Sequence, residues 1–153
     1  MIYFLLCLLV SVLATGAVLL YFWTLESTKI SSVSIIRSFG AFFSEKNTDY
    51  FKNGFILHIL GGIFFGLLYI LLFRILPIPE EGRYTFMYAI VGMGMGFNHG
   101  MLDTLALSVL FPKHHPVEQY KKAGLEIAIF HGLGLIPFGF LMGILYKIFL
   151  ADA

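Results

Sequence analysis

Four side chains that could carry chemistry lie inside long apolar stretches of the sequence: His58, His99, Asp103 and His131. Ionisable groups inside a hydrophobic span are costly, and they usually face the interior of a helix bundle. An imidazole can ligate a transition metal, transfer a proton or hydrogen-bond to a carboxylate. We therefore predict that these four residues form a buried polar cluster between the spans that carry them.

The depth of each residue along its span decides which of them can meet. A helix rises about 1.5 Å per residue, so His58 lies roughly 9 Å past Lys52, near the start of the second span. By the same measure, His131 lies about 13 Å past Lys122, near the start of the fourth span. Asp103 lies about 15 Å before the lysine that follows its own span, which runs in the opposite direction. His99 precedes Asp103 by four residues, so it lies on the same helix face, one turn deeper. Glu126 follows a lysine by only four residues and can reach the interface, so we leave it out of the cluster.

Such a cluster has four possible uses. In a structural role, Asp103 accepts a hydrogen bond from His99 or His58, so that no polar group is buried alone. As a cofactor site, His58, His99 and His131 ligate haem b or a transition metal, since neighbouring glycines leave room for a ring. A proton or solute pathway would require an oligomer, because four helices enclose little space. Acid–base chemistry inside the membrane is the least supported use, since the sequence has neither a nucleophile motif nor a histidine box.

The composition is that of a protein embedded in a bilayer. Of 153 residues, 59% are hydrophobic and 12% are charged, whereas soluble proteins average roughly 45–50% and about 25%. A net charge of +1 leaves no basic surface for a nucleic acid. The single cysteine, Cys7, excludes an internal disulfide and a CxxC site. These values exclude a soluble globular enzyme, a disordered chain and a nucleic-acid-binding protein.

The apolar stretches predict an all-α integral membrane protein with four transmembrane helices in a single domain, residues 1–153. A helix needs about 20 apolar residues to cross the hydrocarbon core. Four stretches qualify: about 2–25, 53–75, 84–111 and 123–147. The first has no Lys or Arg before its apolar run, unlike a signal peptide, so we expect it to remain as a helix. A short interfacial helix is expected within about 31–44, where apolar residues recur at helical spacing around Arg37.

The distribution of Lys and Arg predicts the orientation in the membrane. Four lie in the loop after the first span and three in the loop after the third, against three on the other side. Because cytoplasmic loops carry the excess of positive charge, we expect these two loops in the cytoplasm. Both termini are then outside, in a cell inner or plasma membrane. His114 and His115, in the second of these loops, are expected to be exposed beside a helix end.

Two of the spans share a motif. The second span has H-x-x-G-x-x-x-F-G starting at His58, and the fourth has the same motif starting at His131. With two helices per half, this match suggests a parallel internal repeat of two hairpin-like halves. A short match in a sequence rich in Gly and Phe also arises by chance, and the first span has no histidine to match His99. Pro77–Gly82 is predicted to be the turn between the second and third spans.

Glycines at four-residue spacing allow helices to approach closely. We expect seven of them to pack the second, third and fourth spans together: Gly62, Gly66, Gly92, Gly96, Gly100, Gly139 and Gly143. The first span has few small residues and is expected to be peripheral.

The favoured function is non-catalytic. With almost no mass outside the membrane, the chain is expected to be an accessory or structural subunit that packs in the lipid bilayer with other membrane chains or with itself. One alternative is a membrane protein that binds b-type haem or a transition metal through His58, His99 and His131. The other is an oligomeric proton or solute transporter or channel.

Overall fold

The computed structural model describes residues 2–78 and 85–151, and within these ranges it contains helices and no strands. The predicted all-helical fold is therefore confirmed. Four helices are long: α1 Ile2–Ser27, α3 Tyr50–Ile75, α4 Thr85–His114 and α6 Gly124–Phe149. Two are short, α2 Ile35–Gly40 and α5 Glu118–Lys122, and two single 3₁₀ turns span Ala41–Phe43 and Asn47–Asp49.

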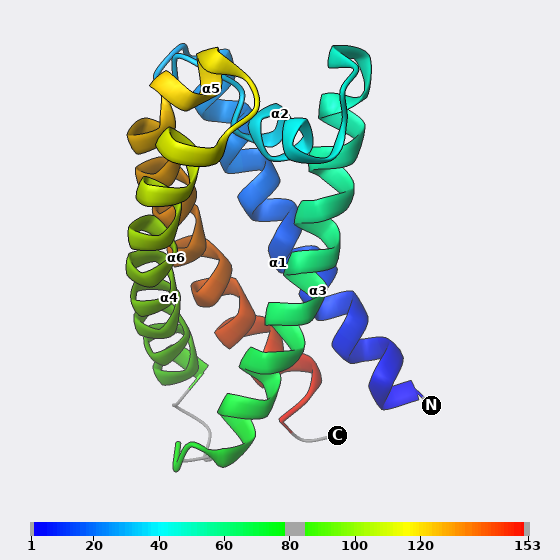
Figure 1. Cartoon of the computed structure of the whole chain (residues 1–153). Helices are drawn as coiled ribbons and strands as arrows, with labels where there is room; N and C mark the ends of the chain where they lie inside the picture. Colours follow the sequence, from blue (N-terminus) through cyan, green and yellow to red (C-terminus); the bar gives the residue numbers. More distant parts are fainter. Residues whose placement is uncertain (1, 79–84, 152–153) are drawn as a thin grey trace.

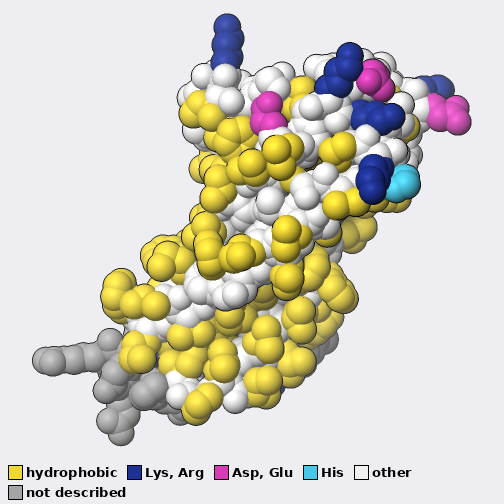
Figure 2. All heavy atoms as spheres, turned by 60° about the vertical axis from the view of Figure 1, so that its left-hand side comes forward, with side chains coloured by type: hydrophobic (Ala, Val, Ile, Leu, Met, Phe, Trp, Pro, Cys, Tyr) yellow, Lys and Arg dark blue, Asp and Glu magenta, His cyan; other side chains and the backbone are white. Residues whose placement is uncertain are grey.

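The long helices alternate in direction, up and down the molecule (Figure 1). The short helices α2 and α5 lie together at one end, and the beginning of α1 and the end of α6 lie at the other. Charged side chains gather at the end that carries α2 and α5, whereas the surface below it is mostly hydrophobic (Figure 2). The two loops that are rich in Lys and Arg are therefore on the same side of the molecule.

Three helices, α1, α3 and α6, are long and apolar enough to cross a membrane, which is compatible with the predicted membrane location. The prediction of four spans is supported for these three. The remaining long helix, α4, has 30 residues but is less apolar, because Asn98, His99 and Asp103 lie near its middle.

The end of α1 has a well-defined backbone cap. Lys29 adopts a positive φ of 58°, and the N–H groups of Lys29 and Ile30 donate to the carbonyls of Glu26 and Leu25 at 3.1 and 3.0 Å. This is the Schellman arrangement, in which a residue in the left-handed region turns the chain out of the helix. It directs the following segment across the end of the bundle, where α2 begins.

The contact between α4 and α6 is the closest in the molecule. We call it the glycine seam; it consists of Gly92, Gly96, Gly100, Gly139 and Gly143. A Cβ atom added at Gly92 would meet the Gly139 carbonyl oxygen, and one at Gly96 would meet that of Leu135. The two backbones therefore lie against each other, and the Thr104 hydroxyl donates across the seam to the Ala128 carbonyl at 3.1 Å.

Helix α1 is not peripheral, so that prediction is wrong. It packs against both α3 and α6. A Cβ atom at Gly62 would meet the Thr15 hydroxyl, and one at Gly66 would meet the Ser11 hydroxyl. Both hydroxyls donate to carbonyls one turn back in α1, at 2.7 and 2.8 Å, so they act as small, satisfied side chains. Because serine and threonine allow close approach as glycine does, α1 takes the face of α3 that was expected to meet α4.

The expected close packing of α3 against α4 is also wrong. Although the two helices are antiparallel, they make almost no backbone contact over the part of the chain that the structure describes. Aromatic rings bridge the space instead, Phe65 to His99 at 4.2 Å and Phe73 to Tyr88 at 5.9 Å between ring centroids. Of the predicted turn, Pro77 and Ile78 are described, and the remaining residues, 79–82, lie outside the described part.

The expected interfacial helix is present as α2, but it is shorter than predicted and packs inward. Four of its six residues are buried. Gly40 and Gly54 bring it directly onto the beginning of α3, since a Cβ at Gly40 would meet the Tyr50 carbonyl oxygen and one at Gly54 that of Ile36. Helix α2 therefore covers the end of the bundle.

His115 helps to hold α2 in this place, and the expectation that it is exposed is wrong. Its side chain is 5% exposed. The Nδ1 atom accepts from the Val117 N–H at 3.0 Å, and Nε2 donates to the Ser38 carbonyl at 2.9 Å. Only its neighbour His114 is exposed, as expected. A histidine satisfied at both nitrogens by backbone groups has a structural role here.

Candidate functional site

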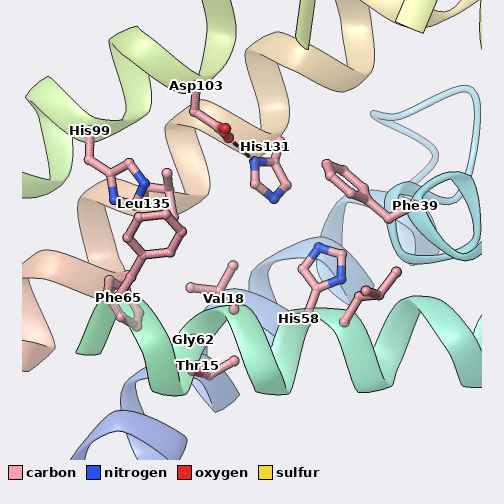
Figure 3. Close-up of a pocket in the computed structure, with 13 residues that line it drawn as sticks. Thr15, Val18, Phe39, His58, Gly62, Phe65, His99, Asp103, His131 and Leu135 are labelled. Carbon is pink, nitrogen blue, oxygen red and sulfur yellow. Dashed lines mark hydrogen bonds and ion pairs between the residues drawn. The ribbon is translucent and has the colours of Figure 1, made fainter. Parts of the chain in front are cut away.

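A cavity of about 210 Å³ lies between the long helices and beneath α2. All four residues of the predicted polar cluster line it, and its other walls are apolar side chains and glycines (Figure 3). We call it the central cavity. Its position follows from the packing described above, because α1 and the glycine seam hold α3 and α4 apart.

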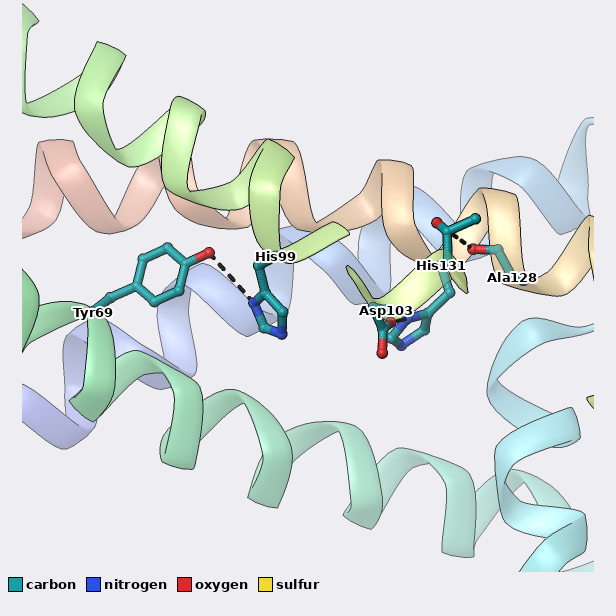
Figure 4. A network of polar contacts seen from close by, with 6 residues as sticks. Tyr69, His99, Asp103, Ala128 and His131 are labelled. Carbon is teal, nitrogen blue, oxygen red and sulfur yellow. Dashed lines mark hydrogen bonds and ion pairs between the residues drawn. The ribbon is translucent and has the colours of Figure 1, made fainter. Parts of the chain in front are cut away.

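Asp103 and His131 form a pair across the glycine seam. The His131 Nδ1–H donates to Asp103 Oδ2 (Figures 3 and 4), and the side chains of His131 and Asp103 are 14% and 25% exposed. The expected partner of Asp103 was His99 or His58. The seam brings His131 to it instead, since α6 lies against α4 whereas α3 does not. The carboxylate fixes the imidazole orientation, and the other ring nitrogen of His131 faces the central cavity.

His58 reaches the central cavity from α3. Its Nδ1–H donates to the Gly54 carbonyl, one turn back, at 2.7 Å. Its Nε2 atom is buried and has no hydrogen-bond partner among the described residues. The ring points across the cavity toward His131 (Figure 3), and the two ring centroids are 5.5 Å apart. Because Nδ1 carries the proton, Nε2 presents an unused acceptor lone pair.

His99 lies at the other end of the central cavity and is held by a tyrosine. The Tyr69 hydroxyl is 3.4 Å from His99 Nδ1, and the Phe65 ring packs on the imidazole. The second nitrogen of His99 points away from Tyr69, toward the side where Asp103 and His131 lie (Figure 4). Tyr69 was not predicted as a site residue, because a tyrosine in the last part of a span is typical of an interface anchor.

Two phenylalanines enclose the imidazoles of His58 and His131. The Phe22 ring centroid lies 5.4 and 5.5 Å from these two rings, and the Phe39 centroid lies 5.0 and 4.5 Å from them. Phe39 comes from α2, so the short helix closes the cavity at this end. The helical spacing in this segment predicted a helix but gave no signal for the direction in which Phe39 points.

Glu126 lies outside the cluster, as its depth indicated. Its carboxylate accepts from the Ser32 N–H at 2.5 Å, from the Ser32 hydroxyl at 2.6 Å and from the Ser31 hydroxyl at 2.9 Å. These bonds tie the beginning of α6 to the loop that follows α1, so Glu126 supports the fold that surrounds the cavity.

The central cavity is open on one side. In the middle of the cavity, the lining residues from α1 and α6 are buried; they are Thr15, Val18, Leu135 and Phe138. The lining residues from α3 and α4 are partly exposed, and they include Gly61, Phe65 and Asp103. The opening therefore lies between α3 and α4, where the two helices are held apart.

The donor set does not gather around one point as a metal site does. Among residues 2–78 and 85–151, no three His, Cys, Asp or Glu side chains are placed so that they could hold a metal ion. A cavity of about 210 Å³ is only somewhat larger than the roughly 150 Å³ cavity that accommodates a benzene molecule. It holds one small ring, not a porphyrin, so the haem and metal interpretations gain no support.

Comparison with protein-family models, with curated proteins and with solved structures found no match. The function is therefore argued from the chemistry of the central cavity.

Proposed function

We propose that the chain is a non-catalytic membrane protein that binds a small, largely apolar molecule with a hydrogen-bond donor in the central cavity. The observation that carries this proposal is the buried Nε2 atom of His58, which has no partner among the described residues and faces the cavity. A buried acceptor without a partner destabilises a protein by about 1–3 kcal/mol. A bound molecule that donates to this atom would recover that loss.

The proposal includes α4 as a fourth membrane span. Thirty residues at about 1.5 Å per residue exceed the roughly 30 Å thickness of the hydrocarbon core. The polar residues that make α4 less apolar than the others include His99 and Asp103, which face the central cavity. The matching motifs that begin at His58 and His131 both place their histidine in this cavity, which supports a parallel repeat of two halves.

The proposed orientation follows the charges. Residues 28–52 and 113–122, which comprise α2, α5 and the adjoining ends of α3 and α4, carry seven of the ten Lys and Arg residues, and they form one end of the molecule. By the excess of positive charge in cytoplasmic loops, this end is cytoplasmic and both termini are outside. The His58 end of the central cavity is then in the cytoplasmic half of the membrane.

Binding explains the cavity better than transport does. A pathway across the membrane needs openings at both ends of the bundle, whereas this cavity is covered by α2 at one end and opens sideways between α3 and α4. A molecule that enters it comes from the lipid.

A subunit role rests on a different surface. The outer side of the glycine seam has a shallow apolar groove lined by Phe97, Met101, Leu105, Ile129 and Leu133, with Gly100 and Gly132 also lining it. A helix of another membrane chain would fit there as helices fit other small-residue surfaces. Cysteine crosslinking from Met101→Cys in native membranes tests this role, and a chain that gives only monomers in that experiment contradicts it.

The test of ligand binding uses two glycines at which an added side chain meets no neighbour. A Cβ at Gly61, which lines the central cavity, or at Gly94, which does not, has no atom within 4 Å. We expect 3-butylphenol to bind saturably to the wild type and to Gly94→Leu in lipid nanodiscs, and not to Gly61→Leu. Equal binding to all three, or to none, contradicts the proposal.

A further inference from the structure

The polar groups of the central cavity lie at its two ends. His58 and the Asp103–His131 pair are at the end beneath α2, and His99 is at the other end (Figure 3). Apolar side chains, among them Val18, Phe65 and Leu135, form the walls between them. A ligand that matches this cavity has an apolar middle and a polar group at each end.

The two ends offer opposite hydrogen-bonding groups. At the first end, His58 Nδ1–H donates to Gly54, so Nε2 can only accept from a ligand. At the second end, Tyr69 is 3% exposed, and its hydroxyl is 3.4 Å from His99 Nδ1. We assign the hydroxyl as the donor in this contact, because buried O–H groups are paired in most structures; the proton of His99 is then on Nε2, which donates.

The size and the walls of the cavity suit a single ring. Its volume of about 210 Å³ exceeds the roughly 150 Å³ that holds benzene, which leaves room for substituents on a six-membered ring. Phe39, Phe65 and Phe138 line the walls, and aromatic rings pack favourably in stacked or edge-to-face arrangements.

We infer that the ligand is a ring with hydroxyl groups at opposite positions, the head group of a hydroquinone, whose apolar tail leaves between α3 and α4 into the bilayer. This inference rests on the proposed function and specifies its ligand. One hydroxyl donates to His58 Nε2, and the oxygen of the other accepts from His99 Nε2. A quinone has only acceptor oxygens, so it lacks the donor that His58 requires. The inference concerns binding alone, and no bond is made or broken.

The experiment compares four probes on the full chain in lipid nanodiscs under nitrogen. They are 2-butylhydroquinone, 3-butylphenol, 2-butyl-1,4-benzoquinone and 1,4-dimethoxy-2-butylbenzene. We expect the hydroquinone to bind about tenfold more tightly than the phenol, as one additional hydrogen bond of ordinary strength provides. The quinone and the dimethoxy compound should show no saturable binding. Hydroquinone without a butyl tail should bind with lower affinity than 2-butylhydroquinone. If it binds with higher affinity, the ligand is a water-soluble ring compound and does not enter from the bilayer.

Two ring-for-ring substitutions separate the two ends. His99→Phe should lower the affinity for the hydroquinone to that for the phenol and leave the phenol unchanged, whereas His58→Phe should weaken both. Gly94→Leu is the control that should bind as the wild type does. If the phenol and the hydroquinone bind equally well, the inference fails and the proposed function stands. If neither probe binds saturably to the wild type, both fail.

Discussion

Helix α4 faces two of the other long helices, α6 and α3, and its contacts with them differ completely. Against α6 it forms the glycine seam, where the glycines bring backbone against backbone. Toward α3 it presents His99 and Asp103 across the central cavity, and ring contacts and the Tyr69–His99 hydrogen bond bridge the distance. The comparison shows how a small membrane bundle can combine a rigid half with an open one.

The difference has a physical cause in helix α1. Ser11 and Thr15 occupy the glycine face of α3, so that face is no longer available to α4. Association of helices in lipid depends on close packing and not on removing apolar surface from water. A pair of helices without matching small residues therefore gains little free energy by packing together. The space that remains becomes the cavity, and the polar residues that would be costly in lipid are turned into it.

The largest expected effect is in the glycine seam. Gly96→Leu places a side chain against the Leu135 backbone carbonyl, which cannot move without separating α4 from α6. We expect the free energy of unfolding to fall by about 3 kcal/mol or more, at the upper end of overpacking effects. Equilibrium unfolding with SDS in mixed micelles measures it.

Gly94→Leu is the matched control for this prediction, since it adds the same side chain two residues away where nothing lies within 4 Å. It should leave the unfolding transition close to that of the wild type. If the Gly96 variant unfolds together with this control, the seam is not the rigid half of the molecule.

The seam was predictable because close backbone approach requires small residues at helical spacing, and these are visible in a sequence. The four members of the polar cluster were predictable because ionisable residues inside a span usually face the interior of the bundle. Which of these residues pair with each other was not predictable. It depends on which helices touch, and Ser11 and Thr15 were not counted among the small residues. Tyr69 in the last part of a span and Phe39 on α2 were missed because the position of an aromatic residue in the sequence does not show which way its ring points.

The contact between α1 and α3 should be intermediate between the two regions. Gly62→Ala brings a methyl group against the Thr15 hydroxyl, a side chain that can itself be removed. We expect a loss of about 1–2 kcal/mol in the wild type and a clearly smaller loss in a Thr15→Ala background, from the same SDS unfolding. An equal loss in both backgrounds would show that Thr15 is not the group that the methyl meets.

The Asp103–His131 pair should contribute less, although it connects both regions. Hydrogen bonds between membrane helices contribute about 0.6–2 kcal/mol, so Asp103→Leu should lower the free energy of unfolding by about 1 kcal/mol. Asp103→Asn should lose less, because its amide oxygen still accepts from His131. A double-mutant cycle with His131→Phe checks the assignment, and a coupling energy near zero would mean that the pair does not hold α4 to α6.

The smallest effect is expected on the open side. Gly61→Leu fills space that no atom occupies within 4 Å of the added Cβ, and leucine favours a helix over glycine by up to about 1 kcal/mol. Its unfolding free energy should therefore equal or exceed that of the wild type, as should that of Gly94→Leu, for which the helix term is the same. Because the two variants share this term, their difference isolates the effect of filling the central cavity. If Gly61→Leu were as damaging as Gly96→Leu, α3 and α4 would have to be packed together, and the open half on which ligand entry depends would not exist.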